Sequence, residues 1–241
     1  MFYKYNHTKI HYRYNSKKKG EILVFLHGWQ GDINSFKTLE ALRKRYNVLE
    51  LSFPPFGKSG EPINWNIFSY ANMVISLCEH LNIKKAHFLG HSFGGRVAIL
   101  ISVIQKELVD KLVLVDSAGM KPRRKLSYYF NNIRYRVRKT VGFSTEKFGS
   151  SDYRLLSLNM KRVFTSIVST HLEEYAAVIK SKTLIVYGKD DKETPLYMAK
   201  RLNKLIPNSK LIVFEDCSHF CYLEKPYEFC KLVRSFFEEQ I

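Results

Sequence analysis

The hydrophobic positions of this 241-residue chain fall into two patterns, short unbroken runs and longer stretches of helical spacing. The runs at 22–26 and 183–187 are apolar at nearly every position, which is typical of strands buried on both faces of a parallel sheet. Residues 2–6 and 9–14 alternate between polar and apolar around a polar turn, so they predict a pair of strands. The predicted strands are 2–6, 9–14, 22–26, 47–52, 86–89, 111–115, 183–187 and 210–214.

Helical spacing follows most of these strands. Residues 66–81 place a set of mainly apolar side chains on one face: Ile67, Tyr70, Ala71, Val74, Leu77, Cys78 and Leu81. Residues 97–104 are apolar on nearly every side, which predicts a helix buried all round. Further helices are expected at about 35–45, 195–206 and 226–239. This alternation predicts an α/β fold with a doubly wound, mostly parallel, eight-stranded sheet covered by helices on both sides.

The regular order stops in one stretch. From about residue 120 to residue 180 the chain is polar, helix-prone and rich in charge, and the order of strand and helix resumes at 183. We therefore expect residues 1–119 and 181–241 to form the core domain, with 120–180 inserted between two strands of its sheet.

Composition narrows the class of protein. Hydrophobic residues make up 45% of the chain, which is ample for a sizeable core, and there is no run of eighteen apolar residues to predict a transmembrane segment. The first residues lack the apolar stretch of a secretory signal. The four cysteines show no Cys-x-x-Cys spacing and are expected to be reduced and buried, as in a cytoplasmic protein. No cluster of metal ligands stands out, so neither a metal ion nor a cofactor is expected.

The positive charge is the unusual feature of the composition. Lysine and arginine number 39 against 22 acidic residues, a net charge of +17. Eight basic residues fall between 121 and 139, and no acidic residue occurs between Ser117 and Thr145. One interpretation is a solvated helix face whose arginines pack on their own tyrosines. The other is a docking surface for an acidic carrier protein or another anionic surface, whereas no nucleic-acid-binding motif accompanies the charge.

One glycine-rich junction carries candidate chemistry. Gly90-His91-Ser92-Phe93-Gly94-Gly95 joins the strand at 86–89 to the buried helix and has the Gly-x-Ser-x-Gly spacing of a nucleophile elbow. A strand that turns abruptly into a helix strains its central residue, and side chains two before and two after would collide. Glycines at 90 and 94 remove those side chains and leave Ser92 projecting from the turn, at a helix N-terminus that favours negative charge.

A serine hydroxyl becomes a good nucleophile only when a base accepts its proton and an acid orients that base. In a doubly wound sheet such residues gather in the loops at the carboxyl ends of the strands. The loop after strand 183–187 contains Asp190 and Asp191, and the loop after strand 210–214 contains His219. Asp116, which ends the strand beside the elbow, is a competing candidate for the acid.

Together these segments resemble the α/β-hydrolase fold family, and its esterases in particular, over nearly the whole chain outside 120–180. Residues 90–95 are similar to the family's G-H-S-x-G-G elbow. Residues 187–195 resemble its W-G-x-x-D-x-x-x-P loop with Tyr187 in place of Trp, and 218–226 resemble G-H-x-x-x-x-E-x-P with Ser218 in place of glycine. Residues 53–59 match the family's D-x-P-G-x-G-x-S loop loosely, with Pro55 and Phe56 off the pattern.

The resemblance implies the role of each site residue. It implies a catalytic triad of Ser92, His219 and Asp191, because Asp191 rather than Asp190 or Asp116 takes the motif position. It also implies an oxyanion hole made by the backbone amides of Trp29 and Phe93, and a helical cap, or lid, formed by 120–180 over the serine. We expect His91 to be structural, and His27 and Ser59 to brace their loops by hydrogen bonds.

The function that follows is a serine hydrolase of the carboxylesterase or thioesterase type, which cleaves an acyl ester or thioester through an acyl-enzyme. With His219 near its ordinary pKa, activity should rise with pH through roughly 6 to 7. One alternative is a non-catalytic binding protein on a hydrolase scaffold. Another is an esterase specific for carrier-protein-bound acyl groups, which would dock on the basic part of the cap.

Overall fold

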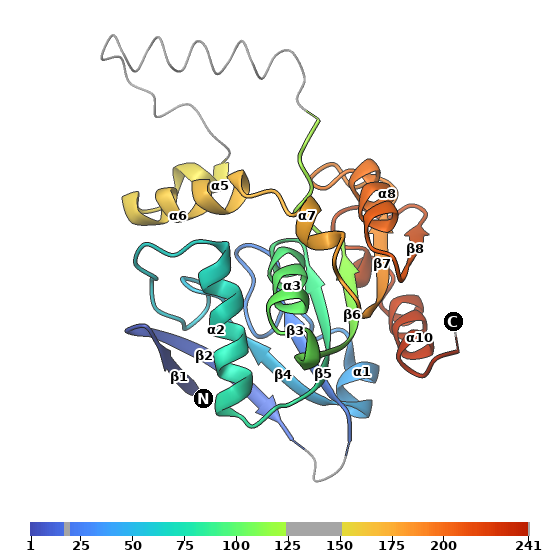
Figure 1. Ribbon diagram of the computed structural model, residues 1–241, viewed down its shortest axis with the longest axis horizontal. Coiled ribbons are helices and arrows are strands. Elements are labelled where there is room, and N and C mark those ends of the chain that lie inside the picture. Colours follow the sequence, from blue (N-terminus) through green and yellow to red (C-terminus); the bar gives the residue numbers. More distant parts are fainter. Residues whose placement is uncertain (17–19, 124–150, 241) are drawn as a thin grey trace.

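A single mixed sheet forms the centre of the molecule. The computed structural model describes residues 1–16, 20–123 and 151–240, and within them eight strands run in the order β1-β2-β4-β3-β5-β6-β7-β8 (Figure 1). The strands are β1 (Phe2–Tyr5), β2 (Thr8–Asn15), β3 (Ile22–Leu26), β4 (Asn47–Leu51), β5 (Ala86–His91), β6 (Val109–Val115), β7 (Lys182–Gly188) and β8 (Ser209–Phe214). All eight strands expected from the hydrophobic pattern are present, with ends that differ by a few residues.

The direction of the strands follows from their connections. β1, β2 and β4 pair antiparallel, since a tight turn joins β1 to β2, and every pair from β4 to β8 is parallel. Parallel neighbours need crossover connections, and helices supply them. The carboxyl ends of β3, β5, β6, β7 and β8 therefore share one edge of the sheet, so the loops that follow these strands meet there.

Helices cover both faces of the sheet, as the alternation of elements predicts (Figure 1). On one face α2, α3 and α8 pack through apolar residues that are fully buried, and on the other α1, α9 and α10 do so. The helices are α1 (Glu40–Arg45), α2 (Ile67–His80), α3 (Phe93–Ile104), a 3-10 turn η1 (Lys106–Leu108), α8 (Leu196–Leu205), α9 (Cys221–Glu224) and α10 (Pro226–Phe237). All four cysteines are buried and free, as expected.

The first helix is shorter than its sequence predicts. Helical structure begins at Glu40 rather than at about residue 35, and residues 33–38 form successive turns. Polar side chains explain the difference, because Asp32 accepts a hydrogen bond from Asn34 N (2.7 Å) and Asp32 N donates to Ser35 Oγ (3.0 Å). Such local bonds to the backbone compete with the helix ladder.

The segment between β6 and β7 contains three further helices in its described part, α5 (Ser151–Arg154), α6 (Leu158–Ser169) and α7 (Glu173–Ala176). In Figure 1, α5 and α6 lie above α2, and α7 lies above α3. Residues 124–150, with most of the basic run, lie outside the described residues, so the cap boundaries at 120 and 180 stay a prediction. None of the described helices has the length and apolar character needed to cross a membrane.

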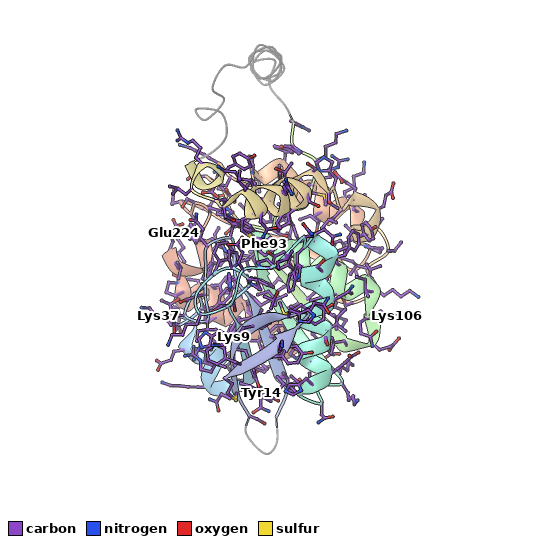
Figure 2. All side chains as sticks on the ribbon, turned by 90° about the vertical axis from the view of Figure 1, so that its left-hand side faces the viewer. Lys9, Tyr14, Lys37, Phe93, Lys106 and Glu224 are labelled. Carbon is purple, nitrogen blue, oxygen red and sulfur yellow. The ribbon has the colours of Figure 1, made fainter. Side chains whose placement is uncertain are left out.

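Lysines lie on more than one side of the described part of the molecule. Lys37 and Lys106 lie at opposite edges of Figure 2, and Lys9 lies between them. Other described lysines pair with acids, as Lys85 does with Asp110 at 2.6 Å.

Candidate active site

Ser92 occupies the junction between β5 and α3, and its backbone is strained. Its φ is +50°, in the left-handed region that side chains rarely adopt. Close packing enforces this turn: a Cβ at Gly94 would lie 2.0 Å from the carbonyl oxygen of Leu26, and one at Gly90 would lie 2.5 Å from that of Gly94. The steric role predicted for these two glycines is therefore confirmed, and the Ser92 side chain stays partly exposed.

Two backbone amides near Ser92 make no hydrogen bond within the described residues. Phe93 N opens α3, where the first amides have no acceptor within the helix. Trp29 follows Gly28, at which an added Cβ would come within 3.5 Å of Ser92 Cβ. Neither the Phe93 nor the Trp29 amide donates to another described protein group. The roles that the resemblance implies for these two amides stay a prediction.

Aromatic rings line this region. The Trp29 ring lies 4.8 Å from Phe56, 5.4 Å from Phe93 and 5.1 Å from Phe164 of α6. Its indole Nε1–H is buried and finds no acceptor in the part of the chain that the structure describes. In Figure 2, Phe93 lies beneath the yellow helices α5 and α6. The rings therefore form an apolar wall around Trp29.

His219 and Asp191 meet at the carboxyl ends of β7 and β8. His219 Nδ1–H donates to Asp191 Oδ2 over 2.9 Å, and both side chains are buried. Asp191 also accepts bonds from Thr194 Oγ1 (2.6 Å) and from the amides of Thr194 (3.0 Å) and Glu193 (2.8 Å). The carboxylate is therefore fixed, and it engages the Nδ1 side of the imidazole rather than Nε2.

The environment shifts both groups. Burial alone raises the pKa of Asp191, but hydrogen bonds from His219 and Thr194 outweigh it and hold that pKa below its ordinary value. Burial alone lowers the pKa of His219, yet the hydrogen bond and charge of Asp191, with the charges of Glu193 and Asp116, raise it above its ordinary value. The imidazole therefore becomes neutral at a higher pH than the sequence led us to expect.

Ser92 and His219 are not hydrogen-bonded to each other in this structure. Among the described residues no hydrogen bond joins Ser92 Oγ to the imidazole, and Glu193 Oε2 lies 3.4 Å from Nε2. His219 nevertheless lies close to the residue that precedes Ser92, since its ring is 4.9 Å from that of His91. Catalytic hydrogen bonds are often long before substrate binds.

Asp116, the competing acid, has a different environment. Its Oδ1 accepts a hydrogen bond from Gly188 N (2.8 Å) and its Oδ2 one from Cys221 N (3.4 Å). Burial raises the pKa of Asp116 to about 6. Asp116 thus ties the end of β6 to β7 and to α9, and it makes no hydrogen bond to His219 within the described chain.

The two other histidines near the serine have structural contacts, as expected. His91 Nε2–H donates to the carbonyl of His219 (2.8 Å), and burial lowers the pKa of His91 to about 3. His27 Nδ1–H donates to Gly28 O (2.6 Å) while its Nε2 accepts from Phe53 N (2.8 Å), and burial lowers the pKa of His27 to about 4. Both imidazole rings are therefore neutral, and their hydrogen bonds hold the surrounding backbone in place. Ser59 Oγ donates to Ser52 O (2.6 Å), which confirms its bracing role.

Several supporting residues were missed in the sequence. Glu224 accepts bonds from Ser218 N (3.0 Å) and Ser218 Oγ (2.7 Å) and so holds the loop before His219, and a glutamate at this motif position was the available signal. Arg96 of α3 is buried, and its Nη1 donates to the carbonyls of Ile167 (2.9 Å) and Thr170 (2.7 Å) at the end of α6. A lone cation at the start of an apolar helix was its signal.

The described residues hold no group of three histidine, cysteine or acidic side chains arranged to bind a metal ion.

The profile of the family described as alpha/beta hydrolase fold matches residues 21–154 and 148–226. The chain belongs to the α/β-hydrolase fold family. Its eight-stranded sheet with flanking helices is the fold of that family, and the protein is a hydrolase of the α/β type.

Sequence and structure alignments with known proteins extend over almost the whole length of this α/β-hydrolase. It is 26% identical over 248 residues to the "Uncharacterized hydrolase YugF" of Bacillus subtilis, covering 91% of this chain and 90% of that protein. It is 28% identical over 249 residues to the "2-hydroxy-6-oxononadienedioate/2-hydroxy-6-oxononatrienedioate hydrolase" of Escherichia coli K12, covering 90% and 86%. Among solved structures, the enol-lactonase of Burkholderia xenovorans LB400 superposes with a TM-score of 0.79 at 20% identity, covering 99% and 100%.

Proposed function

We propose that this α/β-hydrolase is a serine hydrolase that cleaves a carboxylic ester or thioester. Ser92 is the nucleophile, His219 the general base and Asp191 the acid that orients it. The amides of Trp29 and Phe93 bind the oxyanion. The described helices α5 to α7, with the residues before them, act as a cap that bounds the acyl-binding region.

The reaction proceeds in two steps. His219 Nε2 takes the proton of Ser92 as Oγ attacks the carbonyl carbon, and the tetrahedral oxyanion accepts bonds from the two amides. His219 then returns the proton to the leaving oxygen or sulfur, and the acyl group stays on Ser92. In the second step His219 deprotonates a water molecule, which attacks the acyl-enzyme and releases the carboxylic acid.

One observation carries the proposal: a 2.9 Å hydrogen bond joins His219 to Asp191, and the His219 ring lies 4.9 Å from that of His91, the residue before the strained Ser92. A scaffold that only binds a ligand has no need of a strained Ser92 or of a buried carboxylate fixed on an imidazole. The apolar wall around Trp29 supports an uncharged acyl group as substrate.

A fluorophosphonate probe, which reacts covalently with activated serines, tests the proposal. We expect labelling of the wild type and of Ser59→Ala, and none of Ser92→Ala. Ser59 is the matched control, because it is a loop serine whose hydroxyl is engaged with Ser52 O. A wild type that stays unlabelled would favour the non-catalytic binding protein.

A second candidate is hydrolysis of a carbon–carbon bond, because the Escherichia coli relative is named a hydrolase of a 2-hydroxy-6-oxo dienedioate. Comparing kcat/KM for p-nitrophenyl esters, acyl thioesters and such a dienedioate separates the two. We expect the esters to be cleaved faster, since a carboxylate of the protein, Glu193, stands beside the base and disfavours a dianionic substrate.

A further inference from the structure

A second carboxylate stands beside the base on the side opposite Asp191. Glu193 Oε2 lies 3.4 Å from His219 Nε2, and Glu193 belongs to the same loop as Asp191. The Glu193 side chain is 71% exposed whereas that of His219 is 8% exposed. The carboxylate therefore lies where a buried imidazole meets solvent, and the motif that identifies Asp191 gives it no role.

The loop fixes the position from which Glu193 reaches the imidazole. The amides of Glu193 and Thr194 both donate to Asp191 Oδ1, over 2.8 and 3.0 Å, and Thr194 Oγ1 donates to Asp191 Oδ2 over 2.6 Å. Residues 191–194 thus wrap around the acid of the pair. These hydrogen bonds anchor the backbone of Glu193 close to His219. The only conformational entropy lost when the contact forms is therefore that of the Glu193 side chain.

The position of His219 Nε2 indicates which part of a bound substrate would lie next to Glu193. In acyl transfer the nitrogen that takes the serine proton later returns it to the leaving group, so the leaving atom must lie next to Nε2. A carboxylate 3.4 Å from Nε2 is therefore also next to the leaving group. The rings of Phe93 (the residue that follows Ser92), Trp29 and Phe164 pack on one another and carry no charge.

We propose that Glu193 is a specificity-determining residue that selects substrates whose leaving group is neutral or positively charged over those whose leaving group is an anion. This inference rests on the proposed function. A unit charge about 6 Å from the Glu193 carboxylate in a partly solvated site changes kcat/KM by about 3- to 10-fold.

Other charged groups face His219 but do not border the leaving group in this way. Asp191 lies on the Nδ1 side, Asp116 at the end of β6 is buried and tied to Gly188 N, and His91 of β5 is neutral. Glu193 is among the causes that raise the pKa of His219. Its removal should therefore also move the acid limb of the pH profile to lower pH.

Three thioesters with one acyl group and different thiols test the inference. The probes are the butyryl esters of thiocholine (cationic), 2-mercaptoethanol (neutral) and thioglycolate (anionic), and the released thiol is measured with a disulfide dye. The variants are Glu193→Gln and Glu193→Asp, with Asp190→Asn as the matched control, since Asp190 is an exposed acid of the same loop.

We expect the ratio of kcat/KM for thiocholine over thioglycolate to fall about 10- to 100-fold in Glu193→Gln, because the cationic and the anionic leaving group respond in opposite directions, to fall less in Glu193→Asp, and to stay unchanged in Asp190→Asn. An equal fall in Glu193→Gln and Asp190→Asn, or no fall in either, would overturn the inference while leaving the proposed function intact. A wild type that cleaves none of the thioesters and is not labelled by a fluorophosphonate overturns both.

Discussion

Two buried aspartates lie at the carboxyl edge of the sheet, and hydrogen bonds separate their roles. Asp191 receives the imidazole N–H of His219, whereas Asp116 receives backbone amides of Gly188 and Cys221. Both follow a buried strand in the sequence, so burial and topology alone do not distinguish them. Only the spacing from Gly188 to Pro195 favoured Asp191, and that choice is the one that the geometry supports.

Replacing each aspartate by asparagine tests this difference. We expect Asp191→Asn to lower kcat by about 10³- to 10⁴-fold, because an amide no longer holds the imidazole in the tautomer that the reaction needs. Asp116→Asn should lower kcat by less than about 10-fold, since an amide oxygen still accepts from Gly188 N. Steady-state kinetics of the two variants, with circular dichroism to check folding, makes the comparison. Equal losses would assign the acid role to neither residue alone.

The pH dependence should report the environment of His219. The pKa of His219 is raised by its partner Asp191, and the reaction needs the imidazole neutral, so kcat/KM should rise with pH through a midpoint above the ordinary histidine value. The raised pKa also means that the ion pair stabilises the fold most at low pH and that this contribution fades as pH rises through the raised pKa. A pH profile with a neutral ester checks the first statement. A midpoint below 6.5 would contradict it.

The candidate site residues could be predicted from the sequence where a motif fixes their spacing. The contacts between side chains could not. Ser92, Asp191 and His219 were found from the loops in which they stand. The contact of Glu193 with His219 Nε2 and the two hydrogen bonds of Arg96 to the end of α6 depend on side-chain rotamers and on partners that are distant in the sequence, 71 and 74 residues away in the case of Arg96. Local pattern carries no information about such distant partners.

At the scale of elements, the elbow is the feature on which the site depends. α3 packs so closely on β3 that Gly94 has no room for a side chain. The sequence predicted this junction because steric demands at a tight turn act over a few residues. It predicted α1 less well, because Asp32 and Ser35 form local bonds that replace a helical turn.

Adding one methyl group tests the packing of the elbow. We expect Gly94→Ala to destabilise the protein by about 2 kcal/mol or more, since the new Cβ would meet a backbone oxygen that cannot move aside. Gly60→Ala is the control, because its nearest neighbour would be at 3.5 Å, an ordinary contact, and we expect a change below about 1 kcal/mol. Urea unfolding of both variants measures the difference. Similar stabilities of the two variants would show that the backbone around the elbow can shift to accommodate a methyl group.

At the scale of the whole molecule, polar bonds join the described part of the segment between β6 and β7 to the core. Arg96 donates to two carbonyls at the end of α6, Ser157 Oγ donates to Glu61 (2.7 Å), and Asn159 Nδ2 donates to Pro62 O (2.6 Å). Burial lowers the pKa of Arg96 to about 10, so it keeps its charge at neutral pH. Arg96 thus links the nucleophile helix to the segment proposed as the cap.

Removing this link should loosen α6 without unfolding the core. We expect Arg96→Met to increase amide hydrogen exchange in residues 158–170 by roughly 10-fold, which is the loss of one to two hydrogen bonds, while exchange in β5 and β6 stays unchanged. Arg162→Met is the control, because Arg162 is an exposed arginine of the same helix. Exchange measured by mass spectrometry would contradict the prediction if both variants behaved alike.

The order of strands in the sheet has a consequence for biosynthesis. The proposed nucleophile, Ser92, follows β5, the fifth strand made, whereas the proposed base, His219, follows β8, an edge strand and the last of the described strands. A growing polypeptide that has not yet emerged from the ribosome as far as residue 219 can shape its elbow but has no imidazole to activate it. Any ester hydrolysis must therefore wait until β8 has docked, and a chain cut short before that point would be inert toward acyl compounds.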